Sequence, residues 1–265
     1  MNLSLFLHFV KLIIKSQMEY RADFLLGALG QVIGYAAKYL VIWLLISTFE
    51  EINGWGWNEI AFLYSFNLLA YALGASFTYT PMGSLEQFII NGNFDQYLTK
   101  PLPPFIYYLA RLFNIGYVAH IFISLAIMIW AISQSHVDWS VIKIGYLVLA
   151  IISASFLHGA IITFIGAMSF TFIRVKYLFS IYSKMREFIA YPISIYGIAL
   201  QFILTWIVPL GMINYYPSLV LLEKSEQGIS ADFYGIIAII LGPLCFYISY
   251  KLWNRNLKRY EGAGG

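Results

Sequence analysis

Six long apolar segments constrain this chain more than any other feature of its sequence. A helix needs about 20 mainly apolar residues to cross a hydrocarbon core of about 30 Å, and its peptide groups bond to one another inside the helix. Segments of this length occupy residues 22–47, 59–80, 105–133, 142–172, 188–211 and 231–252. Since 60% of the residues are hydrophobic and 11% are charged, the chain is too apolar for a soluble domain. We expect an all-α integral membrane protein with six transmembrane helices in a single domain, residues 1–260.

Basic and acidic residues lie on opposite sides of these segments. Lys and Arg are retained on the cytoplasmic side of a membrane. Thirteen of the sixteen, all except Lys38, Lys143 and Lys224, precede the first segment, lie in or beside the 2-3 and 4-5 connections, or lie at or after the end of the last segment. The other side is mainly acidic, with Glu50, Glu51, Glu59, Asp138, Glu223, Glu226 and Asp232. We therefore expect both termini in the cytoplasm, and we interpret the net charge of +3 as a sign of topology and not of nucleic-acid binding.

The N-terminal stretch precedes the first segment and has a different pattern. Leu3, Phe6, Val10 and Ile13 recur at helical spacing, while His8, Lys11 and Lys15 fall on another face. This pattern predicts an amphipathic helix that lies in the cytoplasmic interface of the membrane. A frayed extension of the first span is the alternative.

The cytoplasmic 2-3 connection, residues 81–104, is polar and rich in turn residues. Leu85 and Phe88 predict one apolar face of a short helix, and Gly92 predicts its end. Pro101, Pro103 and Pro104 then restrict the backbone, since proline fixes its own φ and disfavours helix at the residue before it. We interpret this compact, stiff loop as a surface on which a soluble partner docks.

The connection between the fifth and sixth segments interrupts a helical pattern. Pro209, Gly211, Asn214 and Pro217 break it, and an apolar stretch follows. An interrupted, half-inserted helix would make this region a candidate outer gate, because irregular backbone at membrane depth is tolerated only inside protein or beside a cavity. An ordinary external loop explains the pattern equally well.

Polar residues inside the apolar segments are candidates for a translocation path, since ionisable groups are costly there. The candidates are Lys38, Asn67, His120, His158 and Gln201. Each has a structural alternative: Lys38 can snorkel or pair with a polar neighbour, the histidines can be hydrogen-bonded packing residues, and the two amides can join helices. The lone Cys245 lies in an apolar run and is interpreted as a buried small hydrophobe.

Small residues recur at a spacing of four in three of the segments. The pairs are Gly30 with Gly34, Ala70 with Gly74, and Ser155 with Gly159. Such spacing lets helices approach closely. We expect close packing within the bundle, with a subunit interface as the alternative.

The sequence of the 2-3 connection resembles that of the same loop in a known protein family. Gly92, Asp95, Leu98, Pro101 and Pro104 match the pattern Gly-x-x-Asp-x-x-Leu-x-x-Pro-x-x-Pro, which is similar to the cytoplasmic loop of six-span permease subunits of bacterial ABC-2 type ABC transporters. The likeness is to a subgroup first described as a domain of unknown function. It extends to residues 209–217 and to the tail, residues 257–264. Lys100 departs from the pattern, because an arginine is expected there and lysine lacks its bidentate geometry.

The resemblance implies a fold, partners and a location. It implies an ABC-2 permease fold of the type V exporter kind in the bacterial inner membrane, with the 2-3 loop as the coupling element. The residues implied in ATPase coupling are Leu85, Phe88, Gly92, Asp95, Leu98, Lys100, Pro101 and Pro104. A separate ATPase subunit would bind ATP and Mg, and a second permease chain, the same or related, would complete the pathway within the lipid.

The chain itself carries no phosphate-binding loop of the form Gly-x-x-x-x-Gly-Lys-[Ser/Thr]. We therefore expect no cofactor on this chain and no enzymatic activity of its own, and the energy for export would come from the partner. Two other functions stay open as alternatives. An ion-coupled secondary transporter usually shows repeats and midplane acidic residues, which we do not find. An intramembrane enzyme would need a catalytic motif beside His120 or His158, and none is present.

Overall fold

The computed structural model describes residues 3–17, 19, 21–49, 51–135, 137–172, 174–226 and 230–261. Within these ranges the regular structure is helical and no strand forms, so the expected all-α class is confirmed. The α-helices are α1 (Leu3–Gln17), α2 (Arg21–Phe49), α3 (Trp57–Ile90), α4 (Asp95–Leu98), α5 (Pro104–Arg111), α6 (Val118–Ser133), α7 (Val141–Ala167), α8 (Lys176–Phe188), α9 (Ile198–Phe202), α10 (Tyr215–Leu221) and α11 (Ala231–Leu257). Short 3-10 helices lie at Ile115–Tyr117 (η1), Met168–Phe170 (η2), Ile193–Ile195 (η3) and Leu210–Met212 (η5), and a π-helix at Ile203–Ile207 (η4).

Four of the described helices are long and apolar enough to cross a membrane. They are Trp57–Ile90, Ile115–Ser133, Val141–Phe170 and Ala231–Leu257. A fifth crossing results if Ile198–Ile207 and Leu210–Leu221, which meet at 72°, form one broken span. In α2 the apolar stretch Leu25–Val41 is shorter. The chain is therefore a helical protein with several membrane-spanning segments.

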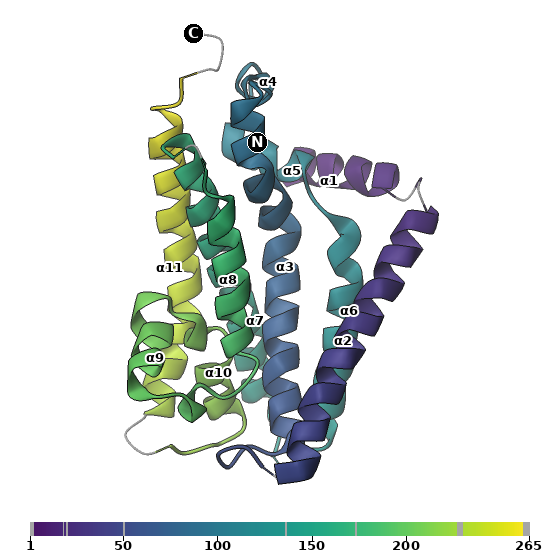
Figure 1. Cartoon of the computed structure of the whole chain (residues 1–265), viewed down its shortest axis with the longest axis vertical. Coiled ribbons are helices and arrows are strands. Elements are labelled where there is room, and N and C mark those ends of the chain that lie inside the picture. The colour runs from purple at the N-terminus through teal and green to yellow at the C-terminus, as the bar shows by residue number, and fades with distance from the viewer. Residues whose placement is uncertain are drawn as a thin grey trace.

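Helix α3 occupies the centre of the bundle, and α1 runs across the long helices near one end of it (Figure 1). The rings of Phe6 and Phe77 stack at 6.0 Å, and those of Phe9 and Tyr107 meet edge to face at 5.4 Å. Phe6 and Phe9 of α1 thus contact α3 and α5, while Lys11 and Lys15 are exposed.

Close packing joins α3, α7 and α11. A Cβ at Gly74 would overlap the carbonyl oxygen of Ser155, and a Cβ at Gly159 would lie 3.3 Å from the ring of Phe246. The expectation of close packing within the bundle is met for the second and third small-residue pairs. By contrast, a Cβ built at Gly30 or Gly34 would have no atom of another element within 4 Å among the residues that the structure describes.

Three expected boundaries differ from the structure. The second span does not end at residue 80, because α3 continues through Pro81 to Ile90, so the expected short helix of the 2-3 connection is the end of α3. The carbonyl of Pro81 accepts a hydrogen bond from the hydroxyl of Tyr108 at 2.8 Å, which holds the helix at this point. The third span, 105–133, is divided between α5 and α6.

The division of the third span has a local cause. Asn114 places its Oδ1 2.7 Å from the N–H of Gly116 and donates its own N–H to the carbonyl of Ser76 at 3.0 Å. An asparagine that bonds to the backbone in this way competes with the helix. Residues 105–133 are apolar almost without interruption, so the hydropathy of the sequence does not reveal the break between α5 and α6.

The fifth expected span, 188–211, is not one helix. Helix α8 ends at Phe188, Pro192 and Gly197 interrupt the chain, and α9 begins at Ile198. Proline cannot donate a backbone hydrogen bond, and it excludes helix from the residue before it. The apolar residues of this region are instead divided among the end of α8, the helical segments Ile198–Ile207 and Leu210–Leu221, and the turns between them.

Candidate functional site

The 2-3 connection is a tight structure closed by a glycine. Helix α3 ends at Ile90, and Gly92 has a φ of +68°, the left-handed conformation that glycine adopts just beyond a helix. The N–H of Phe94 then bonds back to the carbonyl of Phe88 at 3.1 Å. The predicted helix stop at Gly92 is confirmed, and Pro104 is the first residue of α5.

Aromatic rings anchor this connection to three other elements. Phe94 is fully buried, and its ring contacts those of Tyr108 in α5, Phe170 in η2 and Trp253 in α11 at 5.3–6.3 Å. We define the aromatic cluster as Phe88, Phe94, Tyr97, Phe105, Tyr108, Phe170, Trp253 and Tyr260. These rings join the connection to α3, α5, η2 and α11.

The C-terminal tail adds a polar contact to this cluster. The hydroxyl of Tyr260 donates a hydrogen bond to Oδ1 of Asp95 at 2.9 Å. Burial of the hydroxyl and its hydrogen bond to the carboxylate raise the pKa of Tyr260 to about 12. Burial likewise raises the pKa of Tyr97.

The exposed part of residues 90–104, which we call the loop surface, consists of Ile90, Asn91, Asn93, Gln96, Leu98, Thr99, Lys100, Pro101 and Pro103. The structure separates the candidate coupling residues into two groups. Leu98, Lys100 and Pro101 lie on the loop surface. Leu85 is fully buried, and Phe88, Gly92, Asp95 and Pro104 are partly buried behind that surface.

Helix α8 starts beside the same end of α3. One carboxylate oxygen of Glu86 accepts hydrogen bonds from the N–H groups of Val175 at 2.6 Å and Lys176 at 2.9 Å. A carboxylate at a helix N-terminus accepts hydrogen bonds from N–H groups that have no partner within the helix, and its negative charge interacts favourably with the helix dipole. From there α8 runs back along α3 for 13 residues, about 20 Å (Figure 1).

This course places Arg186 deep in the bundle. The guanidinium carbon of Arg186 lies 3.5 Å from the ring centroid of Tyr71, near the middle of the expected span 59–80. An arginine over a tyrosine face is attracted by the ring quadrupole. Among the described residues, Arg186 makes no ion pair, whereas Lys184 pairs with Glu187 at 3.7 Å.

Polar side chains from α3 and α7 meet α8 at this level. We define the mid-bundle cluster as Asn67, Tyr71, His158, Tyr182 and Arg186. Nε2 of His158 lies 3.2 Å from Oδ1 of Asn67, and Nδ1 lies 2.5 Å from the hydroxyl of Tyr182. Because an amide oxygen only accepts, Nε2 carries the proton and the tyrosine hydroxyl donates to Nδ1. The interhelical bond of Asn67 and the packing role of His158 are therefore observed.

The other path candidates lie elsewhere. His120 is buried with its ring against Tyr117 at 5.2 Å. Gln201 donates to the carbonyl of Tyr196 at 2.7 Å, and this contact closes the turn before α9 without joining two long helices. The side chain of Lys38 lies outside the described residues.

The contact of Arg186 with Tyr71 was not predicted, because the residue was counted among the basic groups of a cytoplasmic connection. The sequence does contain a pattern that indicates this contact. Phe179, Tyr182 and Arg186 recur at helical spacing, which indicates one helical face that carries two aromatic rings and a cation. Because α8 also carries polar residues, its apolar content is lower than that expected of a membrane-spanning helix.

The residues of the candidate outer gate lie at or just after the bend between the helical segments Ile198–Ile207 and Leu210–Leu221. Nδ2 of Asn214 donates to the carbonyls of Leu63 at 2.9 Å and Ile189 at 2.7 Å. A Cβ at Gly211 would lie 2.9 Å from Ile193. Pro209 marks the break, and Pro217 is buried in α10. This region is helical and packed into the bundle, and its length and composition fit a broken span or a re-entrant loop.

Contacts between loops hold the same end of the bundle. The indole N–H of Trp55 and the hydroxyl of Tyr215 both bond to the carboxylate of Glu226. Lys224 pairs with Glu59 at 2.8 Å. The turn before α3 is thereby tied to the segment that follows α10.

The long apolar helices, the polar cluster within the bundle and the tightly built connection at one end define a multi-pass membrane protein. Residues 32–264 match the family described as ABC-2 family transporter protein. The chain therefore belongs to the ABC-2 family of transporter membrane proteins and is a permease of an ABC transporter. Among curated proteins, none matches the chain.

Proposed function

We propose that this chain is the transmembrane subunit of an ABC exporter in a bacterial inner membrane, powered by a separate ATPase subunit. Six crossings with both termini in the cytoplasm account for most of the distribution of charge, although Lys184 and Arg186 would then lie within the composite crossing. The six crossings would be α2, α3, α6, α7, α11 and a composite crossing made of α8 and the bent helices. Helix α1 would then lie in the cytoplasmic interface.

The loop surface is the proposed docking site of the ATPase. Leu98 is 39% exposed and Ile90 48% exposed at the tip of a cytoplasmic connection, with Lys100 beside them. Exposed apolar side chains with a polar rim are typical of an interaction site. The observation that carries the proposal is this surface on a rigid aromatic base, in a chain of the ABC-2 family.

Two connections support transmission of movement from this surface. The aromatic cluster joins the loop to the ends of α7 and α11, and Glu86 joins the end of α3 to the start of α8. ATP and Mg would be bound by the partner, and its movement would reach Arg186 through α8. A second permease chain would face this helix across a shared pathway.

Co-purification tests the proposal. The tagged full-length chain is purified from native membranes, any ABC ATPase that co-purifies is identified by mass spectrometry, and the Leu98→Asp variant is compared with Val141→Asp. Val141 is 87% exposed at the other end of the bundle. We expect Leu98→Asp to lose most of the ATPase and Val141→Asp to keep it. An ATPase absent from the wild-type preparation, or retained equally by both variants, would contradict the proposal.

A further inference from the structure

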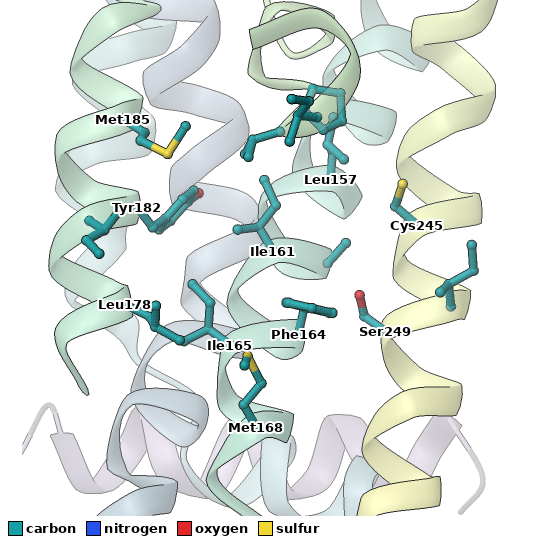
Figure 2. A pocket seen from close by; sticks show the side chains of 16 residues that line it. Leu157, Ile161, Phe164, Ile165, Met168, Leu178, Tyr182, Met185, Cys245 and Ser249 are labelled. Carbon is teal, nitrogen blue, oxygen red and sulfur yellow. The ribbon is translucent and has the colours of Figure 1, made fainter. Parts of the chain in front are cut away.

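Helix α8 borders a cavity on each of two sides. The cavity of about 490 Å³ toward α7 and α11 is apolar, and Figure 2 shows Leu178, Tyr182 and Met185 pointing into it from α8. The second cavity, of about 630 Å³, lies between α8, α3 and η1, and we call it the polar cavity. All the serines and lysines of α8 line the polar cavity: Lys176, Ser180, Ser183 and Lys184.

The polar face of α8 combines two cations with two hydroxyl groups. Lys176, Ser180 and Lys184 follow one another at intervals of four residues, so they lie on one face of the helix. The two lysine side chains can therefore reach a group that is bound opposite Ser180. The hydroxyls of Ser180 and Ser183 make no hydrogen bond to any residue that the structure describes, so both can donate to a ligand.

Helix α3 supplies a further hydroxyl donor from the opposite wall. Nδ2 of Asn114 donates a hydrogen bond to Oγ1 of Thr80 at 3.2 Å. The N–H of Gly116 holds Oδ1 of Asn114 at 2.7 Å and thereby fixes the orientation of the amide. Because Oγ1 of Thr80 accepts the bond from Asn114, its own proton is left for another partner. Thr80 lines the polar cavity, so its hydroxyl can donate to the same ligand.

No neighbouring carboxylate neutralises the polar cavity. Among the described residues that line it, none is Asp or Glu. Glu187 lies 3.7 Å from Lys184, but the two side chains are 56% and 78% exposed, and such a pair is weak in water. Glu86 is engaged with the N–H groups of Val175 and Lys176. Both lysine ammonium groups are therefore available to an anion.

Aromatic rings form another wall of the polar cavity. The rings of Tyr79 and Phe179 meet edge to face at 5.9 Å, and Tyr117 lies beside them in the lining. A volume of about 630 Å³ falls in the range of sites that hold small organic molecules, and it exceeds the needs of a single inorganic anion. The matching occupant therefore joins an anionic group to an organic body.

We propose that the polar cavity binds an organic phosphate, with its phosphate group between Lys176 and Lys184 and its organic part against the aromatic wall. A phosphate carries nearly two negative charges and three acceptor oxygens, which match two cations and several hydroxyl donors better than a carboxylate does. This inference rests on the proposed function, because it names the class of molecule transported. The phosphate belongs either to a soluble molecule or to a lipid head group.

Acylation of the lysine amines measures occupancy of the site. The full-length chain is purified in dodecyl maltoside, which contains no phosphate, and an N-hydroxysuccinimide ester is added with or without glycerol 3-phosphate. Mass spectrometry gives the rate at each lysine. At a concentration of twice Kd, acylation of Lys176 and Lys184 should slow about threefold, while the exposed Lys258 of the tail keeps its rate. Equal slowing at Lys258, or no slowing at Lys184 up to about 10 mM, would overturn the proposal.

A substitution at Gly83 tests the cavity without changing its charge. Gly83 lines the polar cavity, and a Cβ built there would have no atom of another element within 4 Å among the described residues. The side chain of Gly83→Leu would fill this space and should abolish the protection of Lys184. Gly145→Leu is the matched control, since Gly145 is equally unobstructed and is not part of this lining. Undiminished protection in Gly83→Leu would show that the anion binds outside the cavity.

A charge variant provides a second test in a chain that keeps the cavity open. Lys176→Gln removes one of the two cations, so protection of Lys184 should require about tenfold more glycerol 3-phosphate. Lys258→Gln removes a charge from the tail and should leave the titration unchanged. An equal effect of the two substitutions would mean that only the overall charge of the protein matters, and it would overturn the proposal.

Two further probes identify the source of the phosphate. Lysophosphatidic acid adds an acyl chain to glycerol 3-phosphate, so stronger protection by this lipid would support a head-group site, and equal protection would support a soluble ligand. Inorganic phosphate that protects as well as glycerol 3-phosphate would overturn the organic part of the proposal. The measurement needs no ATPase. A failure here therefore leaves the docking proposal intact, and loss of the docking proposal leaves this binding measurement unchanged.

Discussion

The hydroxyl of Tyr260 donates a hydrogen bond to Oδ1 of Asp95 at 2.9 Å, and this contact ties the C-terminal tail to the 2-3 connection. Asp95 was expected to act on the ATPase, but its carboxylate is already engaged inside the chain. A role in fixing the shape of the connection follows directly from this geometry. The exposed Leu98 then becomes the better candidate for contact with the partner.

The Tyr260→Phe variant should be less stable by about 1 kcal/mol at neutral pH, because one hydrogen bond to a charged group is lost. The pKa of Tyr260 is raised to about 12 from its usual 10. The protonated hydroxyl therefore stabilises the fold fully below pH 10, and this contribution is lost as the pH rises from 10 to 12. The difference in Tm between wild type and variant should be present at pH 8 and small at pH 12; a difference independent of pH would contradict the assignment.

Glu86 should be needed for coupling and not for ATPase binding. Its carboxylate holds the first N–H groups of α8, so Glu86→Ala would free α8 from the end of α3. We expect the purified complex to keep its ATPase activity and to lose most of its transport. Glu86→Gln retains a hydrogen-bond acceptor and should recover part of that transport. Full transport in Glu86→Ala would show that α8 is driven from elsewhere.

Gly74→Ala should destabilise the packing of α3 on α7. The added Cβ would overlap the carbonyl oxygen of Ser155, and relief of such overlap costs about 1–3 kcal/mol. Gly145→Ala is the matched control, since no atom lies within 4 Å of its Cβ and alanine favours helix by up to about 1 kcal/mol. Thermal unfolding in detergent measures both variants. Equal Tm values would mean that these helices are not in close contact.

Asn214→Asp should destabilise the bend between the two short helices. The amide of Asn214 donates to the carbonyls of Leu63 and Ile189, whereas a carboxylate would face two acceptors without a proton. The expected cost is about 2 kcal/mol or more. Asn58→Asp, in the first turn of α3, loses only an exposed contact of 3.4 Å with the carbonyl of Gln134, and an acidic group is favourable at that position, so its effect should be close to zero. A stable Asn214→Asp variant would indicate that the bend is not held by this amide.

The sequence was informative wherever a local rule decides the structure. The stop at Gly92, the close approach of Gly74 and Ser155, and the break at Pro209 each follow from the conformational freedom or the size of one residue. The helical class followed from the long apolar segments, because inside a membrane a helix pairs the backbone N–H and C=O groups of such a segment with one another.

The remaining features depend on tertiary contacts. The contact between Tyr260 and Asp95 joins distant parts of the chain, and no local pattern indicates it. The hydrogen bond from Tyr108 to the carbonyl of Pro81 joins α3 to another helix, and no local pattern indicates it. The contact of Arg186 with Tyr71 was not predicted, because hydropathy averages over all faces of a helix and does not show which face of α8 packs on α3.

Cross-linking from a single cysteine tests the central claim most directly. The chain carries Cys245→Ser with Leu98→Cys on the loop surface, or with Val141→Cys at the opposite end as control. Membranes are treated with a bifunctional thiol-to-amine reagent, and the adducts are identified by mass spectrometry. The account predicts an adduct with an ABC ATPase from position 98 and none from position 141. No ATPase adduct from position 98, or equal adducts from both positions, would contradict it.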